Sequence, residues 1–340
     1  MRYRVLGPSG IRVGELALGT MTFGTAWEWG ADKAECGRML EAFVEAGGNF
    51  VDTACNYTDG ESETIVGELL DGRRDRFVVA TKYPLTLDRS DPNAGGNHSK
   101  SLRRAVEQSL RRLRTDYIDL LWLHMWDRTA AIENVMYALD VQVRAGKVLE
   151  VGFSDTPAWV VAEAIRVAER YGLCRPVGVQ APYNVAWRDI ERELLPMVAA
   201  HNLAALTWDA LGGGVLTGKY SPGNKEPRRY GDSPVSVGQA TVAQVVRELA
   251  GQAGATPAQV SLAWVLSRRS EGWNLIPLLG ARSETQLRDN LGALNVQLGP
   301  EARRRLDEAA GFELGFPRSF LEDEEMLDLI HAEFRHVLDF

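Results

Sequence analysis

Short apolar runs alternate with longer amphipathic segments along most of the chain. The runs are rich in Val, Ile and Leu, as is typical of buried strands. The segments between them repeat their apolar positions at helical spacing. From this pattern we expect strands at 16–19, 49–52, 77–82, 118–124, 148–153, 177–180, 203–208 and 275–277.

A helix is predicted after each of these strands. Ser62 is expected to cap the second helix, and Pro157 fits the first turn of the fifth. Regular alternation predicts a parallel sheet, and eight units close into a (β/α)8 TIM barrel, whereas doubly wound sheets usually stop near six strands. The expected helices are 32–46, 62–70, 99–113, 129–145, 157–171, 190–201, 257–267 and 284–291.

The two ends of the chain lie outside this alternation. Residues 1–15 predict a β-hairpin that turns at Pro8-Ser9-Gly10, and residues 16–295 form the barrel. Residues 296–340 predict two further helices, 300–310 and 322–340, the second of which begins with an acidic run. We therefore expect a single α/β domain over 1–340.

Three connections are longer than a turn requires, at 84–97, 183–189 and 212–239. All three leave the carboxyl ends of predicted strands. Barrel enzymes carry their active sites at that end, and long functional loops belong there.

Composition restricts the partners. The net charge of −8 argues against a nucleic acid, and the arginines of 103–114 recur at helical spacing, as on a solvated helix face. Cys36, Cys55 and Cys174 are too far apart for a disulfide framework and indicate a reducing compartment. No run approaches the ~18 apolar residues of a membrane span, and no signal-peptide core is present. We expect a cytoplasmic protein that acts on a small molecule; its oligomeric state stays open.

Polar groups end three successive predicted strands. Asp52 ends one, with Tyr57 five residues on, Lys82 ends the next, and His124 the third. Taken singly, they have ordinary interpretations as a helix cap, packing residues or a satisfied core histidine. Carboxyl ends of parallel strands share one rim, so we expect the four side chains to meet, with Asp52 pairing the buried Lys82.

This combination predicts a proton-donating site for carbonyl reduction. A phenol titrates near ~10, and an adjacent ammonium should lower the pKa of Tyr57. Asp52 would hold Lys82 charged, and a neutral His124 would orient a carbonyl oxygen. The set contains no activated nucleophile, metal site or electron source, so the hydride must come from a cofactor.

Two glycine-containing segments are candidates for binding that cofactor. No GxGxxG follows the first strand, which excludes a Rossmann site. Barrels bind phosphates after strands seven and eight. There the chain has 209–214, followed by Lys219, and Gly280-Ala281-Arg282-Ser283, whose arginine could clamp a phosphate.

Over nearly its full length the chain resembles the aldo-keto reductases. The matching segments are Leu18-Gly19-Thr20-Met21-Thr22-Phe23-Gly24, Asp52-Thr53-Ala54 with Tyr57, Ala80-Thr81-Lys82, Thr115–Leu120 with His124, Gly152-Phe153-Ser154, Gln180 with Tyr183-Asn184, Leu216–Tyr220, and Gly280–Ser283 with Gln286 and Asn290-Leu291.

The resemblance implies an NADPH-dependent reductase of aldehydes or ketones, with Tyr57 as the acid, assisted by Asp52, Lys82 and His124. It also implies a set of cofactor contacts. These are Thr20, Met21 and Asp52 at the nicotinamide ribose, Ser154, Asp155 and Gln180 at the carboxamide, Trp208 stacked on the nicotinamide, Asp209, Leu211, Gly213 and Lys219 at the pyrophosphate, and Gly280, Arg282, Gln286, Asp289 and Asn290 at the adenosine and its 2'-phosphate.

The chain departs from the family pattern at two cofactor positions. Asp155 stands where Asn or Arg is usual, and Asp209-Ala210 replaces Ser-Pro. Both departures add a carboxylate near the cofactor, so the preference for NADPH over NADH stays open.

The segments 122–127 and 155–159 resemble bacterial reductases, some of which act on nucleotide-linked keto- or enoyl-sugars. A sugar-sized pocket floored by aromatic side chains and packing at the barrel rim are both open interpretations of these residues. The candidates are Trp27, Tyr83 and Trp126, with Trp29 and Trp187.

Two other classes of function remain. One is a barrel enzyme in which Lys82 forms a Schiff base. The other is a cofactor-sensing regulatory subunit of low turnover, similar to the potassium-channel subunits of the family. His124 argues against the second, because by resemblance those subunits lack the histidine.

Overall fold

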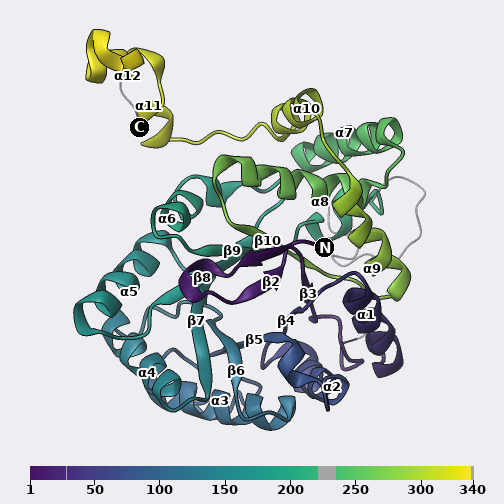
Figure 1. Ribbon diagram of the computed structural model, residues 1–340, viewed down its shortest axis with the longest axis vertical. Coiled ribbons are helices and arrows are strands. Elements are labelled where there is room, and N and C mark those ends of the chain that lie inside the picture. Colours follow the sequence, from purple (N-terminus) through teal and green to yellow (C-terminus); the bar gives the residue numbers. More distant parts are fainter. Residues whose placement is uncertain (28, 221–234, 338–340) are drawn as a thin grey trace.

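In the computed structural model, which describes residues 1–27, 29–220 and 235–337, eight parallel strands close into a barrel (Figure 1). Going round the barrel the order is β10, β3, β4, β5, β6, β7, β8, β9. The TIM-barrel prediction is therefore confirmed. The strands are β3 (Ala17–Gly19), β4 (Phe50–Asp52), β5 (Val78–Tyr83), β6 (Ile118–Leu123), β7 (Val148–Ser154), β8 (Pro176–Pro182), β9 (Ala204–Trp208) and β10 (Leu275–Leu279).

Helices surround the barrel (Figure 1). Their starts follow from local chemistry: Asp32 caps α1, and Ser236 and Thr256 form capping boxes at α7 and α8. The helices are α1 (Lys33–Glu45), α2 (Glu61–Leu69), α3 (Ser99–Leu113), α4 (Ile132–Arg144), α5 (Ala158–Tyr171), α6 (Leu194–Ala200), α7 (Val237–Ala253), α8 (Pro257–Ser267), α9 (Glu284–Leu291), α10 (Pro300–Ala310), α11 (Arg318–Leu321) and α12 (Glu324–His331).

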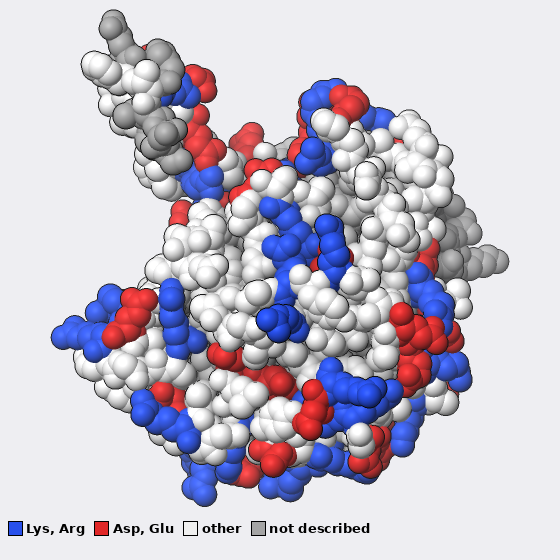
Figure 2. Space-filling model, viewed as in Figure 1, with Lys and Arg blue, Asp and Glu red and all other residues white. Residues whose placement is uncertain are grey.

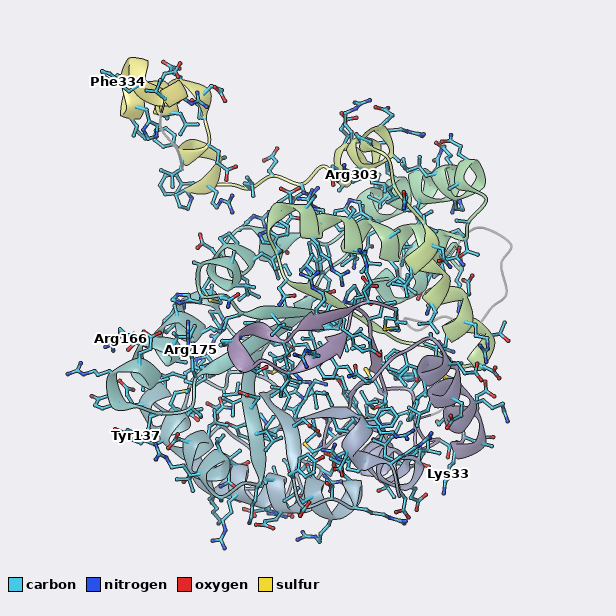
Figure 3. The ribbon with its side chains drawn as sticks, in the orientation of Figure 1. Lys33, Tyr137, Arg166, Arg175, Arg303 and Phe334 are labelled. Carbon is cyan, nitrogen blue, oxygen red and sulfur yellow. The ribbon has the colours of Figure 1, made fainter. Side chains whose placement is uncertain are left out.

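The strand alternation sorts side chains into two cores. Leu121 and Leu123 face the helix layer, whereas Leu120 and Trp122 fill the barrel interior. The interior is packed with side chains rather than open, as Figure 3 shows. Each fully buried Leu contributes roughly 1.5–3 kcal/mol.

The N-terminal hairpin, β1 (Tyr3–Val5) and β2 (Arg12–Gly14), lies across the barrel (Figure 1). Leu6 and Val13 are fully buried in the inner core, and Gly7 lies against the start of β8 at Val177. The hairpin thus closes the end at which the strands begin. The rim at which the strands end remains for a site.

Four sequence predictions need correction. Ser62 does not cap α2; it lies inside the helix, and its hydroxyl bonds to Thr20, while Gly60 occupies the cap. Residues 237–253, partly assigned to a loop, form α7. Helices expected to begin at 129 and 190 begin as α-helix at Ile132 and Leu194, the latter after a 3-10 turn. The segment 221–234 of the predicted loop lies outside the described residues.

The last predicted helix, 322–340, is replaced by shorter pieces. Asp323 caps α12, whose first turn holds Glu324 and Glu325, and a 3-10 turn (Ala332–Val337) follows; residues 338–340 lie outside the described part. The acidic start of a helix is confirmed, but its length is not. Figure 1 shows α11 and α12 projecting from the barrel beyond an extended connection.

Candidate active site

A buried ion pair links the ends of two adjacent strands. Asp52 ends β4 and Lys82 lies near the end of β5; the two side chains are 3% and 0% exposed. The Lys82 ammonium donates to Oδ2 of Asp52, to the carbonyl of Thr53 at 2.8 Å and to the hydroxyl oxygen of Tyr57 at 3.2 Å. An ammonium has three donors, so every one is used and its orientation is fixed.

Tyr57 begins a 3-10 turn (Tyr57–Gly60) directly after β4. Thr58 and Asp59 have φ of 45° and 57°, and this left-handed backbone keeps the turn tight. Because its oxygen accepts a hydrogen bond from Lys82, the proton of Tyr57 can point away from the lysine. The turn therefore holds the phenol beside Lys82, at the rim where the strands end.

Burial changes the pKa of Tyr57 from what the sequence predicts. Burial raises the pKa of Tyr57, and the charge of Lys82 opposes this rise without cancelling it. The expectation that Lys82 brings the pKa of the phenol below its ordinary value is therefore wrong. Burial also acts to lower the pKa of Lys82, but Asp52 and Tyr57 outweigh it and leave that pKa raised. Lys82 is thus held as an ammonium.

His124 follows β6 and completes the expected group of four. Its ring meets that of Tyr57 edge-on, with centroids 6.0 Å apart. Burial, helped by the charge of Lys82, lowers its pKa to about 3. Its Nδ1 is buried without a hydrogen-bond partner among the described residues. The neutral imidazole that the sequence predicted is therefore the form present near neutral pH.

Two residues that the sequence did not link to Asp52 hold its second oxygen. Nε1 of Trp122 donates to Oδ1 at 3.0 Å, and Nε2 of Gln180 donates to the same atom at 2.9 Å. The resemblance assigns Gln180 to the cofactor alone. Trp122 belongs to the matching segment 122–127, and the alternation of β6 already places its side chain inside the barrel.

The predicted nicotinamide-side residues fall into two groups, on β7 to β9 and around β3 and β4, with β10 between them. Thr20 follows β3 and bonds to the backbone oxygen of Asp52 through both its N–H and its hydroxyl, at 2.9 and 3.0 Å. Gln180 pairs in register with Ser154, and Trp208 ends the neighbouring β9. Met21, next along the chain, is half-buried. Asp52 joins the two groups, because Thr20 bonds to its backbone oxygen and Gln180 to its side chain.

Asp155 adopts φ of 42°, a left-handed conformation that Asp tolerates better than most residues. Burial raises the pKa of Asp155, while a hydrogen bond from the Trp208 side chain and the charge of Lys82 oppose the rise. The carboxyl group thus contacts the aromatic ring expected to stack on the nicotinamide.

Asp209 bends back onto the glycine segment that follows β9. Its Oδ1 accepts from the N–H of Gly213 at 2.6 Å, and its own φ is 57°. The carboxylate therefore occupies a backbone donor in the segment expected to bind the pyrophosphate. Leu211 lies within this turn and Lys219 follows it; both are half-buried.

The segment after β10 combines an open backbone with a positive side chain. Gly280 has open space where a Cβ would lie, and Arg282 is half-buried just before α9. Gln286 accepts from the N–H of Arg282 at 3.0 Å, and Asn290 donates to the carbonyl of Gly280 at 3.2 Å. These four shape one loop.

Asp289 differs from its neighbours in this group. Its carboxylate accepts from Thr256 at 3.0 Å and from Gln259 at 2.9 Å, and so ties α9 to the start of α8.

The aromatic candidates separate into two groups. Trp27 packs on Trp29 with centroids 5.4 Å apart and reaches Asp59, beside the Tyr57 turn. Trp187 meets Trp208 edge-on at 6.0 Å. Tyr83 is wrong as a substrate contact: it is fully buried in the outer core, because the residue after inward-facing Lys82 must face outward. Trp126 is partly buried against the same outer core.

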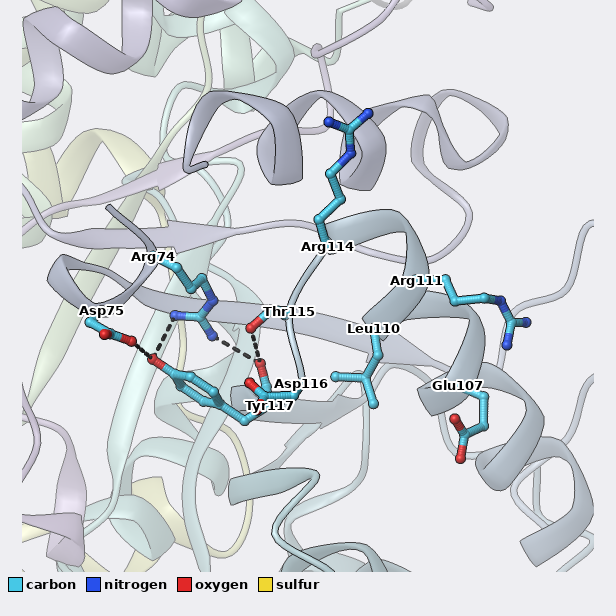
Figure 4. Close-up of a pocket in the computed structure, with 9 residues that line it drawn as sticks. All are labelled: Arg74, Asp75, Glu107, Leu110, Arg111, Arg114, Thr115, Asp116 and Tyr117. Atoms are coloured by element: carbon cyan, nitrogen blue, oxygen red, sulfur yellow. Dashed lines mark hydrogen bonds between the residues drawn. The ribbon is translucent and has the colours of Figure 1, made fainter. Parts of the chain in front are cut away.

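A separate pocket of about 580 Å³ lies at the opposite rim, where β6 begins (Figure 4). Arg74 stacks over Tyr117 at 4.2 Å and pairs with Asp119 at 2.6 Å. Such pairing at the strand-start rim stabilises the barrel. Figure 2 shows positive and negative side chains intermixed over most of the visible face.

The whole-chain comparisons agree with this geometry. The family model described as "Aldo/keto reductase family" matches residues 15–310. The chain belongs to the aldo/keto reductase family. It is an oxidoreductase. The family and the names of the relatives support the reduction of a carbonyl group.

Several curated fungal proteins are similar over almost the full length. Norsolorinic acid reductase stcV of Emericella nidulans is 40% identical over 94% of this chain and 84% of its own length. Putative aryl-alcohol dehydrogenase AAD14 of Saccharomyces cerevisiae is 36% identical, with 95% and 90% covered. Aryl-alcohol dehydrogenase [NADP(+)] of Phanerodontia chrysosporium is 34% identical, with 98% and 92% covered. Among the described residues, no helix has the length and apolarity to cross a membrane.

The lowered pKa of His124 predicts a loss of stability in acid. Between about 6.5 and about 3, the unfolded chain binds a proton that the folded protein does not, so the free energy of unfolding falls as pH drops through this window. From pH 7 to pH 5, wild type should lose about 2 kcal/mol more than His124→Gln. Urea unfolding at the two pH values measures this difference, and equal losses in both proteins would contradict a neutral His124.

Proposed function

We propose that this protein reduces an aldehyde or ketone to an alcohol with NADPH, and that Tyr57 donates the proton. The observation that carries the proposal is the hydrogen bond from the Lys82 ammonium to the Tyr57 oxygen, at 3.2 Å. Each other part of the site supports that contact or positions a substrate beside it.

The chain's own residues divide the work. Lys82 stabilises the phenolate that remains after proton transfer, and Asp52 keeps Lys82 charged. His124 is neutral and can donate one hydrogen bond to the carbonyl oxygen, which fixes its angle to the Tyr57 proton. Together they surround an oxygen that gains negative charge during reduction.

Burial of Tyr57 fits an enzyme that must hold its proton until charge develops. A phenol with a raised pKa stays protonated at neutral pH. The developing alkoxide is a far stronger base than a ground-state carbonyl, so transfer becomes favourable only as reduction proceeds. Lys82 then stabilises the phenolate in the reduced-polarity surroundings, where its charge acts strongly.

A dinucleotide fits the part of the rim formed by the segments after β9 and β10. NADPH, when bound, supplies the hydride. Support comes from the open space at Gly280, the Arg282 guanidinium beside the start of α9, and the left-handed glycines after β9, which permit close approach of backbone. The contact of Asp209 with Gly213 occupies one donor at the proposed pyrophosphate site, so the contact of Arg282 with the 2'-phosphate is a larger part of the affinity for NADPH.

An aromatic carbonyl compound is the substrate class we favour. The relatives are named for norsolorinic acid and aryl alcohols. In this chain the Trp27–Trp29 pair lies beside the Tyr57 turn, and the Trp187–Trp208 pair lies across the rim. Flat indole faces suit an aryl ring by stacking.

A Schiff-base function for Lys82 is less well supported. A lysine nucleophile needs a neutral amine and therefore a lowered pKa, whereas the pKa of Lys82 is raised.

The three free cysteines, of which Cys36 and Cys55 are buried, fit the cytoplasmic location that we propose.

Replacing Tyr57 by Phe removes the proposed proton and one of the three acceptors of the Lys82 ammonium. We expect turnover of an aryl aldehyde with NADPH to fall by at least ~100-fold, while NADPH binding, followed by fluorescence, stays within threefold. Tyr83→Phe is the matched control: it removes a buried hydroxyl that has no partner among the described residues, and should keep wild-type turnover. Wild-type turnover in Tyr57→Phe would end the proposal.

The Arg282 guanidinium should give the preference for NADPH over NADH. Loss of a charge-assisted bond to the 2'-phosphate should raise the Kd for NADPH about 10–100-fold in Arg282→Gln and leave that for NADH nearly unchanged. Arg288→Gln, on the exposed side of α9, controls for the lost charge. Equal weakening toward both dinucleotides, measured by titration calorimetry, would contradict a phosphate clamp.

A further inference from the structure

Trp122 occupies the inside of the barrel directly beneath the catalytic group. Its side chain is fully buried, and its Cα pairs in register with Lys82 on one side and Gly152 on the other. Trp122 therefore belongs to the same layer of the barrel as the catalytic ammonium.

The neighbouring strands are shaped around this ring. A methyl group on Gly152 would lie 2.3 Å from Cζ3 of Trp122, and one on Gly178 would lie 3.5 Å from Cη2. Gly178 in turn pairs with Ala204. Two successive strands thus have glycine beside the indole, which fixes its plane and its direction.

The fixed ring directs its one polar atom at the catalytic carboxylate. Nε1 of Trp122 donates to Oδ1 of Asp52 at 3.0 Å, and Lys82 donates to the other oxygen, Oδ2. A carboxylate held at both oxygens cannot turn about its Cβ–Cγ bond without losing a hydrogen bond. Gln180 also reaches Oδ1, at 2.9 Å, but lies where the cofactor is expected.

We propose that Trp122 is a positioning residue for the reaction: its indole N–H locks the Asp52 carboxylate so that Oδ2 faces Lys82. This inference rests on the proposed function of Tyr57 and Lys82. Trp122 touches neither substrate nor cofactor, and acts through Asp52. Because the indole is sealed inside the barrel, its hydrogen bond does not depend on whether a dinucleotide occupies the rim.

The electrostatic consequence follows from the charges that face Tyr57. These are Lys82, which favours the phenolate, and Asp52 and Asp155, which disfavour it. The Trp122 N–H offsets part of the negative charge of Asp52. Without that donor Asp52 draws the Lys82 proton more strongly, and the phenol becomes a weaker acid.

Trp122→Phe tests this role, because it removes the N–H and keeps an aromatic ring. We expect kcat for aldehyde reduction to fall about tenfold with KM for NADPH within twofold. In alcohol oxidation, where Tyr57 must be deprotonated, the limiting pKa of the pH profile should rise by about one unit. The pKa of Tyr57 in the apo protein can be measured by tyrosinate absorbance. Subtracting the signal of the Trp122→Phe/Tyr57→Phe double variant isolates Tyr57, and its pKa should show the same rise.

Trp264→Phe is a matched control. Trp264 is also fully buried, and its Nε1 donates to Asp307 at the same 3.0 Å distance, but in the outer core. Both variants should lose thermal stability, and only Trp122→Phe should shift the pH profile. A profile that coincides with wild type in Trp122→Phe, or equal shifts in both variants, would overturn the inference.

Gly152→Ala provides an independent test should Trp122→Phe not fold. Its methyl group presses on the indole while the N–H remains, so the hydrogen bond to Asp52 is strained rather than deleted. A shift of the pH profile in the same direction is expected, and an unchanged profile in a folded Gly152→Ala protein would overturn the inference. The Tyr57→Phe test can be told apart from these. Wild-type turnover in Tyr57→Phe would refute the proposed function, whereas an unchanged pH profile in Trp122→Phe would refute only the role of Trp122.

Discussion

A buried positive charge sets the geometry of this site. Moving an ammonium out of water costs several kcal/mol unless partners replace its hydration. Lys82 is fully buried and has three such partners: a carboxylate, a backbone carbonyl and a phenol oxygen. Removing one of them would leave an uncompensated charge in the barrel. The cost of burying Lys82 therefore constrains the position of Asp52 and Tyr57, and both constraints serve the proton donation that we propose.

The barrel satisfies that constraint through strand register. β4 and β5 are adjacent and parallel, so Asp52 and Lys82 reach the same rim from neighbouring strands. Inward parity on β6 then adds Trp122 below and His124 above. The hairpin closes the opposite end, and β3, which leads into the expected cofactor contacts Thr20 and Met21, is the other neighbour of β4. The proposed proton donor and the proposed cofactor site therefore share one rim of the barrel.

Much of this could be predicted because it depends on local period and strand order. The eight strands, their parallel arrangement and the meeting of Asp52, Lys82 and His124 follow from alternation alone. Two misses could have been avoided from the same information. The parity of β5 places Tyr83 outside once Lys82 lies inside, and the Ser236…Gln239 capping box marked the start of α7.

Other features depend on contacts between distant residues and could not be read from the pattern. The bond from Trp122 to Asp52 spans 70 positions, and the space for the indole comes from glycines on two further strands. The direction of the Tyr57 pKa shift depends on how deeply the phenol is buried, which no spacing reveals. The charge of Asp209 is likewise visible in the sequence. Its hydrogen bond to Gly213 is not, because that bond depends on the left-handed turn of the folded chain.

The central claim is that the Lys82 charge acts directly on the Tyr57 hydroxyl. The most direct measurement is the pKa of Tyr57 by NMR with 13C-labelled tyrosine in wild type and Lys82→Met, with the signal assigned through Tyr57→Phe. We expect a higher pKa of Tyr57 in Lys82→Met, because the charge that opposes the effect of burial is gone. An unchanged or lower pKa would contradict it.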